Sequence, residues 1–252
     1  MSLRHSFRVS RSRFFVYLGV TLAATGILCP VPCLARDRQP PASTLRWDEA
    51  TPGCTFSQTS DGKYDYGMQV NDVHVIVSVD SQELEKVRRR HELFFSVLVS
   101  VKYRGSSAID VHPENISLEF VRHFRVVQTS LDPNDFSQKV QNDADEFDRQ
   151  IAREVQKHPE QKTAKEAQAR NFQKDSAELL EFISKNTLKP SHLDSASRDV
   201  SGWAMFSTEN KWIGAWKKEE EFIVRVPIAG EIFEFPFKLP PKPGELLLRN
   251  RQ

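Results

Sequence analysis

A charged segment in the middle of this 252-residue chain separates two segments that alternate as β-strands do. In residues 134–189, apolar side chains such as Phe136, Val140 and Phe147 recur at helical spacings of three, four or seven. Before and after this segment, apolar side chains recur with the period of two that is typical of strands. The chain must therefore join two separated β-segments into one structure, with a helical insert between them.

The β-segment after the insert, Asp199–Pro240, is the most aromatic window and holds three of the four tryptophans. The strongest strand patterns before the insert lie at residues 68–80 and 92–104. A strand that is apolar on both faces lies inside a sheet, and both 92–104 and Val200–Phe206 have this character. These patterns predict an α+β protein, an antiparallel β-sandwich in which Asp199–Pro240 packs against the earlier strands.

The insert itself is predicted to be a helical hairpin over residues 134–189. Asp132 or Asn134 can cap its first helix, and Pro159 ends that helix and opens the second. An amphipathic helix usually packs its apolar stripe on a core, and here that core would be the sandwich. The alternatives are a projecting hairpin that binds a partner and a hairpin that forms a dimer contact.

The N-terminus has the order of features found in a secretory signal peptide. Four arginines without an acidic residue precede the apolar run Phe14–Leu28, and the small residues Cys33 and Ala35 suit the −3 and −1 positions of a cleavage site. The apolar run is shorter than the roughly 20 residues that span a membrane. We therefore expect residues 1–35 to be removed, with a retained anchor as the alternative.

The predicted mature chain is divided into three parts. Residues 36–51 are rich in proline and polar residues and are predicted to be a flexible leader, with Trp47 as its first anchored residue. Residues 52–240 form the β-sandwich domain with its insert. Residues 241–252 form an extended C-terminal tail.

Charge and cysteine content narrow the classes of partner. Removal of the four N-terminal arginines leaves 31 basic and 34 acidic residues, a balance that disfavours nucleic acid as a partner. With the signal removed, no contact with a membrane is expected. Cys54 is the one cysteine that remains, so no internal disulfide can form. It is either a small buried hydrophobe or a thiol that pairs between molecules.

Catalytic and cofactor-binding patterns are missing from the sequence. It contains none of the common zinc, nucleotide or nucleophile-elbow motifs, and its histidines lack ligand spacing, so no cofactor, metal or catalytic residue is expected. The carboxylate run Glu219–Glu221 and the cluster at 143–146 fall in segments predicted to be exposed, whereas a glycosidase needs two facing carboxylates in a cleft.

One aromatic pair is a candidate binding site. Trp212 and Trp216 lie in a loop-like stretch beside Lys217 and Lys218. Exposed tryptophans here would bind a protein partner or a sugar, because aromatic side chains supply much of the energy of contacts. The alternative is that these rings only anchor the loop or fill the core, since exposed paired tryptophans are uncommon.

Two strand-rich runs resemble a known class of domain. HELFFSVLVSVKYRGSSAIDVHPENISL (residues 91–118) and VPIAGEIFEFPF (residues 226–237) are similar to the accessory immunoglobulin-like sandwiches of exported bacterial proteins. The resemblance implies an immunoglobulin-like antiparallel β-sandwich with an inserted helical hairpin and a non-catalytic binding or assembly role, and it transfers no site residue. The conserved immunoglobulin cysteines are absent, and the insert departs from the plain pattern.

The function expected from the sequence is a non-catalytic, exported binding or assembly module of the cell envelope with a protein partner, either periplasmic or secreted. One alternative is an envelope hydrolase or a carbohydrate-binding or carbohydrate-active protein. Another is a structural protein that dimerises through the hairpin.

Overall fold

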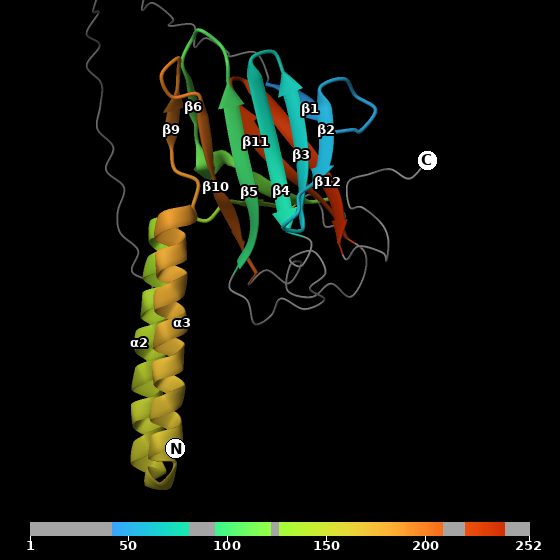
Figure 1. Ribbon diagram of the computed structural model, residues 1–252. Helices are drawn as coiled ribbons and strands as arrows, with labels where there is room; N and C mark the ends of the chain where they lie inside the picture. Colours follow the sequence, from blue (N-terminus) through green and yellow to red (C-terminus); the bar gives the residue numbers. More distant parts are fainter. Residues whose placement is uncertain (1–41, 81–93, 122–125, 209–219, 240–252) are drawn as a thin grey trace, which may run out of the picture. The chain divides into compact units, whose positions relative to one another are not determined.

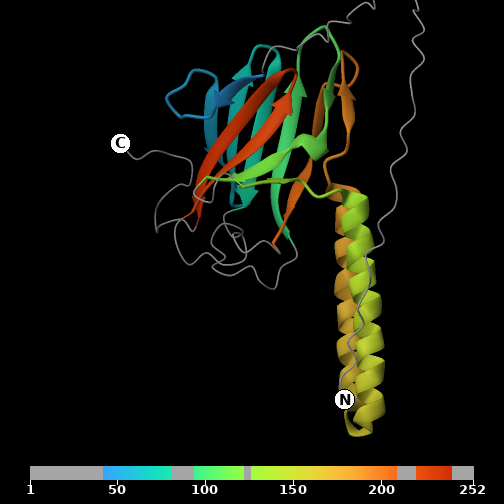
Figure 2. The same ribbon diagram turned by 180° about the vertical axis from the view of Figure 1, so that it is seen from behind.

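The computed structural model describes residues 42–80, 94–121, 126–208 and 220–239, which all belong to one compact unit, Pro41–Gln252. The described residues form twelve strands, two α-helices and two short 3-10 helices (Figure 1). Most of the strands lie in two five-stranded sheets, and a helical hairpin extends from one end of them (Figures 1 and 2). The α+β class and the inserted hairpin are confirmed.

The first sheet has the order β1-β12-β11-β7-β8 and the second has the order β10-β5-β4-β3-β2. All neighbouring pairs in them are antiparallel except β1 and β12, which are parallel. Strands β6 and β9 form a separate antiparallel pair. The first sheet contains β1 (Ser43–Arg46), β7 (Ser117–Phe120), β8 (Val126–Thr129), β11 (Glu220–Ile228) and β12 (Glu231–Leu239). The second contains β2 (Cys54–Gln58), β3 (Lys63–Val70), β4 (Val73–Asp80), β5 (Phe94–Tyr103) and β10 (Asp199–Ser207).

The main core lies between the two sheets and follows the alternation of the sequence. Phe233, Phe235 and Phe237 of β12 are all buried in it, as the period of two predicts. From the other sheet, alternate residues of β4 and β5 point into the same core. They are Val73, Val75, Val77, Val79, Phe95, Val97, Val99, Val101 and Tyr103. Burial of so many large apolar side chains supplies the main driving force for folding.

The expected flexible leader is in part a strand, so the sandwich begins at Ser43 and not at residue 52. Ser43–Arg46 pairs with β12, and Trp47 is 3% exposed. The indole Nε1 of Trp47 donates to the carbonyl oxygens of Thr55 (3.2 Å) and Gly67 (3.1 Å). Trp47 is anchored as predicted, but it is not the first anchored residue, because Ser43–Arg46 already pairs with β12.

One expectation for the region after the insert is corrected. Val200–Phe206 was expected to be central, yet β10 lies at the edge of its sheet. Trp203 is half-buried on the outer face of β10. Between the insert and β10 lies the strand β9 (Ser191–Leu193), which pairs with β6 (Ile109–Val111).

The predicted strand over residues 68–80 is two strands joined by a tight turn. β3 ends at Val70 and β4 begins at Val73, with Asn71 in the left-handed region at a φ of 51°. Asparagine tolerates this conformation better than most residues do.

Pro236 of β12 has no backbone N–H to donate to a neighbouring strand. It lies beyond the four residues of β12 that pair with β1, so no hydrogen bond between these two strands is lost.

Candidate functional site

The helical hairpin is the largest element outside the sandwich. It contains α2 (Pro133–Lys157), a short 3-10 turn η2 (Pro159–Gln161) and α3 (Lys162–Asn186). Each helix has 25 residues and is therefore about 37 Å long at 1.5 Å per residue. Both ribbon views show the pair running away from the sandwich, so the hairpin projects and does not lie along a sheet (Figures 1 and 2).

Local sequence signals set both ends of the hairpin. The Asp132 carboxylate accepts from the backbone N–H groups of Asn134 (2.8 Å) and Asp135 (3.1 Å), and Pro133 occupies the first turn. This is the predicted N-cap, and it satisfies donors that the helix leaves without partners. At the C-terminal end of the hairpin, the Thr187 hydroxyl donates to the carbonyl oxygen of Ile183 (2.7 Å) and closes α3.

Both chain connections of the hairpin are bonded to the outer edge of β10. The backbone N–H of Leu131 donates to Met205 O (2.7 Å), and that of Leu188 donates to Trp203 O (3.1 Å). Trp203 and Met205 are alternate residues of β10, so their carbonyl groups point to the same edge of the strand. These bonds occupy a strand edge that would otherwise offer a template for pairing with another chain.

A small second core fixes the root of the hairpin. Phe136, Val140 and Ile183 bury themselves against Met205 on the outer face of β10. Aromatic rings extend this core: Phe94 lies 5.7 Å from Phe136 and 6.4 Å from Phe182 between ring centroids, and Phe182 lies 6.1 Å from Trp203. This packing explains why β10 is apolar on both faces although it is an edge strand.

Beyond the root, the apolar side chains of α2 and α3 pack against each other in a single seam. The apolar positions of α2 are separated by four, four, three, four and four residues: Phe136, Val140, Ala144, Phe147, Ile151 and Val155. The repeat of eleven gives about 3.67 residues per turn, near the 3.6 of a straight helix. Two straight helices can therefore stay in contact along the hairpin.

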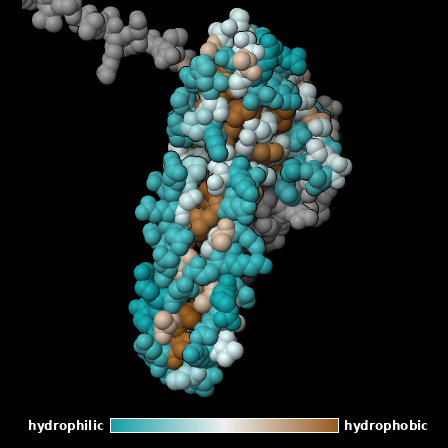
Figure 3. Space-filling model, turned by 60° about the vertical axis from the view of Figure 1, so that its left-hand side comes forward, coloured by the Kyte–Doolittle hydropathy of each residue, from teal (hydrophilic) through white to brown (hydrophobic). Residues whose placement is uncertain are grey.

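The seam is incompletely covered. α3 buries Ile183, whereas Leu179 and Leu180 stay partly exposed. The rings of Phe147 and Phe172 contact each other with their centroids 4.4 Å apart and their planes tilted by 35°, and Phe172 remains 37% exposed. Each of these phenylalanines lies two residues from the middle of its helix. Figure 3 shows the resulting broken apolar stripe between hydrophilic flanks.

Charges on the hairpin are divided between its two halves. The half next to the sandwich, residues 133–148 and 171–186, carries eight acidic and three basic residues, and we call it the root half. The other half, residues 149–170, carries six basic and three acidic residues and is the tip half. The hairpin is thus an arm with an acidic root and a basic tip.

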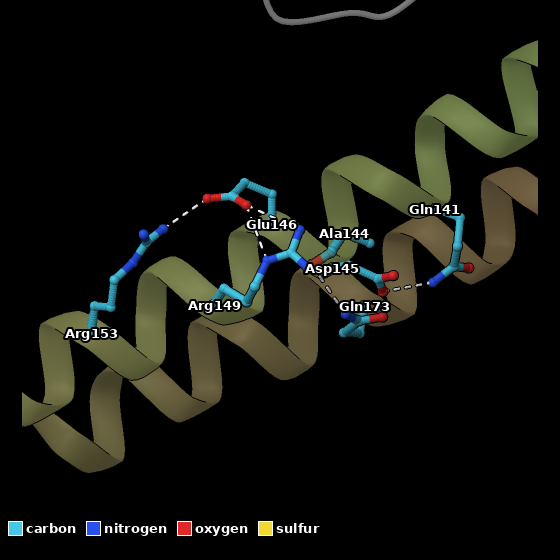
Figure 4. Close-up of polar contacts among 7 residues, drawn as sticks. All are labelled: Gln141, Ala144, Asp145, Glu146, Arg149, Arg153 and Gln173. Carbon is cyan, nitrogen blue, oxygen red and sulfur yellow. Dashed lines mark hydrogen bonds and ion pairs between the residues drawn. The ribbon is translucent and has the colours of Figure 1, made fainter.

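The border between the two halves is marked by an exposed ion-pair group (Figure 4). Arg149 Nε donates to Glu146 Oε2 (3.1 Å), and an Arg153 guanidinium nitrogen donates to Glu146 Oε1 (2.7 Å). These hydrogen bonds, that of Arg149 first, hold the pKa of Glu146 below its ordinary value. All three side chains are exposed, so the group adds little stability and can rearrange.

The root also borders a pocket of about 490 Å³. Its lining includes Asp132 and Lys189 from the two connections and Trp203 from β10. A short segment, Pro113 and Glu114, completes the wall. The polar groups do not converge on a single point with matched chemistry, so we assign this pocket to the junction of the hairpin with the sandwich.

A row of charges crosses the outer face of the first sheet. Arg225 of β11 is bonded to Glu119 of β7 and, through Nε, to Glu234 Oε1 of β12 (2.7 Å). Arg46 of β1 donates to the other oxygen of Glu234 (3.1 Å). Acids and bases alternate and balance along the row, and this is the arrangement expected of a structural network.

The candidate residues Trp212, Trp216, Lys217 and Lys218 lie outside the described residues, so their role stays a prediction. Cys54 is a free, partly buried thiol that packs against the main core.

Two histidines elsewhere in the described residues have shifted pKa values. Burial, and then Lys102 and Arg104, lower the pKa of His74, whereas the hydrogen bond that His192 Nδ1 donates to Asp110 (2.8 Å) raises the pKa of the exposed His192. Within the described ranges, no group of three His, Cys, Asp or Glu side chains could hold a metal ion. None of the helices in those ranges is long and apolar enough to cross a membrane.

Sequence reasoning found the hairpin but not its anchorage. The charge division of the hairpin can be seen in the sequence once the turn is placed at Pro159. Residues at similar distances before and after the turn then lie side by side, so the charges of each half can be counted. The bonds of Leu131 and Leu188 to β10 could not be found in this way, because backbone pairing leaves no residue signature.

Comparison with protein-family models, curated proteins and solved structures gives no match for this chain. What the protein does is therefore inferred from the hairpin and its root.

Proposed function

We propose that this chain is a non-catalytic, exported binding or assembly module of the cell envelope, in which the sandwich is the scaffold and the hairpin binds a protein partner. The observation that carries this proposal is the incompletely covered seam of the projecting hairpin, with Phe172 37% exposed at its middle. Partly exposed apolar stripes on helices are a common means by which proteins bind helical partners.

The anchorage of the hairpin supports a binding role. An arm held at both connections, by Leu131 and Leu188 on β10, presents its seam in a defined direction. Such preorganisation lowers the entropy that association costs. The aromatic root cluster around Phe94 and Phe136 adds a packed base, so force or contact at the arm is transmitted to the sandwich.

The immunoglobulin-like arrangement and the export of the chain belong to the same proposal. Two five-stranded sheets, antiparallel in every neighbouring pair except β1 and β12, support an immunoglobulin-like scaffold. The basic, apolar and small-residue order of residues 1–35 supports export.

A shortened hairpin tests the proposal. Residues 143–176 are replaced by a short glycine-rich loop, which joins positions that lie opposite each other because Gln173 Nε2 donates to Ala144 O (3.3 Å; Figure 4). This variant keeps Phe136, Val140 and Ile183 and therefore the root core. It should unfold with nearly the same midpoint in denaturant as the full chain.

The full chain without residues 1–35 should capture a specific protein from an envelope extract, and the shortened hairpin should not. Equal capture by the two proteins would place the binding site on the sandwich and would refute the proposed role of the hairpin.

A further inference from the structure

We infer that the partner of the hairpin is a second copy of this chain, docked antiparallel so that the tip of each hairpin lies against the root of the other. This inference rests on the proposal that the hairpin is the binding element. It names the occupant of the seam, and it fixes the direction in which that occupant lies.

Charge complementarity sets the direction in which the second hairpin lies against the first. The root half carries eight acidic and three basic residues, and the tip half carries six basic and three acidic residues. A parallel pair of hairpins would place acidic root against acidic root and basic tip against basic tip. An antiparallel pair places each basic tip half on an acidic root half, and complementary charge across an interface sets its register and disfavours other arrangements.

The partly exposed pair Phe147 and Phe172 marks the centre of the proposed interface. Phe147 and Phe172 each lie two residues from the middle of their helices, and their ring centroids are 4.4 Å apart. In an antiparallel pair the two-fold axis passes through the middle of both hairpins. An interface around such an axis uses the same patch on both copies, so the four phenylalanines would meet at its centre. Aromatic residues at the centre of an interface commonly supply most of its binding energy.

The size of the surface is sufficient for a stable dimer. A face about 37 Å long and two helices of about 10 Å wide offers roughly 700 Å² per copy. This area is close to the roughly 800 Å² per partner of standard specific interfaces. The result would be an antiparallel four-helix bundle with a sandwich at each end, in which the seams of the two hairpins face each other.

The ion-pair group of Glu146, Arg149 and Arg153 lies near the middle of the hairpin. In the antiparallel dimer, charged side chains at this place could change partners from their own hairpin to the second copy. Arg149 and Arg153 are held by Glu146 within one hairpin, and all three side chains are more than half exposed. An exposed pair of this kind is worth little, so the arginines can turn toward acidic residues of a second copy at low cost. Asp143 and Asp175 are exposed acidic residues of the root half that lie within two residues of the middle of their helices, close to where the two copies would cross.

The first test measures self-association of the chain without residues 1–35 by sedimentation velocity over a range of concentrations. We expect a dimer, and Phe172→Glu should raise its dissociation constant at least about tenfold by placing a charge at the centre of the interface. Ala177→Glu is the matched control, because it adds the same carboxylate at an exposed position of the same helix. Circular dichroism verifies that both variants keep their helices.

The second test isolates the charge pairing. Arg149→Glu with Arg153→Glu should weaken the dimer, and so should Asp143→Lys with Asp175→Lys. All four changes in one chain should restore it, because tip and root then exchange signs together. A parallel dimer would show no restoration, since like charges would still face each other.

The third test measures direction. A spin label at Gln161→Cys in a Cys54→Ser chain marks the tip of each hairpin. Antiparallel docking places the two labels at opposite ends of the bundle, about 40 Å apart, whereas parallel docking places them within about 20 Å. The short distance would overturn the inference.

A chain that stays monomeric at about 100 μM would also overturn the inference, because it excludes a micromolar dimer. That result leaves the proposed function standing if the full chain still captures a protein that the shortened hairpin does not. If the shortened hairpin still captured the protein and still self-associated, both the proposed function and the inferred dimer would be refuted.

Discussion

Arg225 is the residue on which the charge balance of the first sheet depends. It lies between Glu119 and Glu234, whose side chains are only 4% and 7% exposed. A carboxylate at such burial is tolerated only when a cation and hydrogen bonds compensate it. Arg46 supplies a second cation to Glu234, but its own side chain is 55% exposed. The two arginines of the row should therefore differ greatly in their effect on stability.

Replacement of Arg225 by Met should destabilise the protein by about 3–5 kcal/mol, because Glu119 loses the cation that is bonded to it while remaining buried. Arg46→Met, at the exposed end of the same row, should cost no more than about 1 kcal/mol. Denaturation in urea, followed by circular dichroism, gives both values. If the two variants lost similar amounts of unfolding free energy, the claim that Arg225 compensates a buried carboxylate would be wrong.

At the scale of elements, the hairpin depends on the close approach of its second connection to β10. A Cβ at Gly202 would lie 2.5 Å from the backbone N of Leu188 and 2.8 Å from the carbonyl carbon of Thr187. Only glycine lets the connection come this close and form the bond from Leu188 to Trp203.

Gly202→Ala should therefore cost about 1–3 kcal/mol and speed hydrogen exchange at the Leu188 amide, because the backbone must move to make room. Gly230→Ala is a useful comparison. Gly230 sits at a φ of 81° with open space around it, so its replacement strains only its own turn. Nuclear magnetic resonance should show faster exchange at Leu188 in the first variant and unchanged exchange there in the second.

The tip of the hairpin should be sensitive to acid. Lys165, and then Gln150, bond to Glu154 across and along the helices and lower its pKa from the ordinary value of 4.5. A lowered pKa in the folded state contributes stability above pH 4.5, and this contribution is lost as the pH falls through the lowered value. The protection of the tip amides, taken as their exchange rate relative to the intrinsic rate at the same pH, should therefore fall below pH 4.5. Glu154→Gln should remove most of this pH dependence, and an unchanged profile in that variant would contradict the assignment.

The helices were predictable from sequence because their signals are local. The spacing of Phe136, Val140 and Phe147, the cap at Asp132 and the break at Pro159 each act within a few residues. The position of β10 was not predictable, because an edge strand covered by a helical root is as apolar as a central strand. Trp203 illustrates this ambiguity, because its ring packs near Phe182 of the hairpin and not between the sheets.

At the scale of the whole molecule, the sandwich and the hairpin have different roles. The sandwich buries its large side chains between two sheets, whereas the hairpin carries a single seam that its own two helices cover only in part. A protein that gained only stability from the insert would be expected to lay it along a sheet, where its apolar stripe would be fully covered. The division of charge along the hairpin adds direction to the exposed seam.

Comparative capture tests most directly the central claim that the hairpin is the protein-binding element. The full chain without residues 1–35, the shortened hairpin, Phe172→Glu and Ala177→Glu are immobilised in equal amounts and exposed to the same envelope extract. The account predicts one bound protein (this chain itself or another) that is retained by the full chain and Ala177→Glu and is lost with the shortened hairpin and Phe172→Glu. Undiminished capture by the shortened hairpin would contradict the claim.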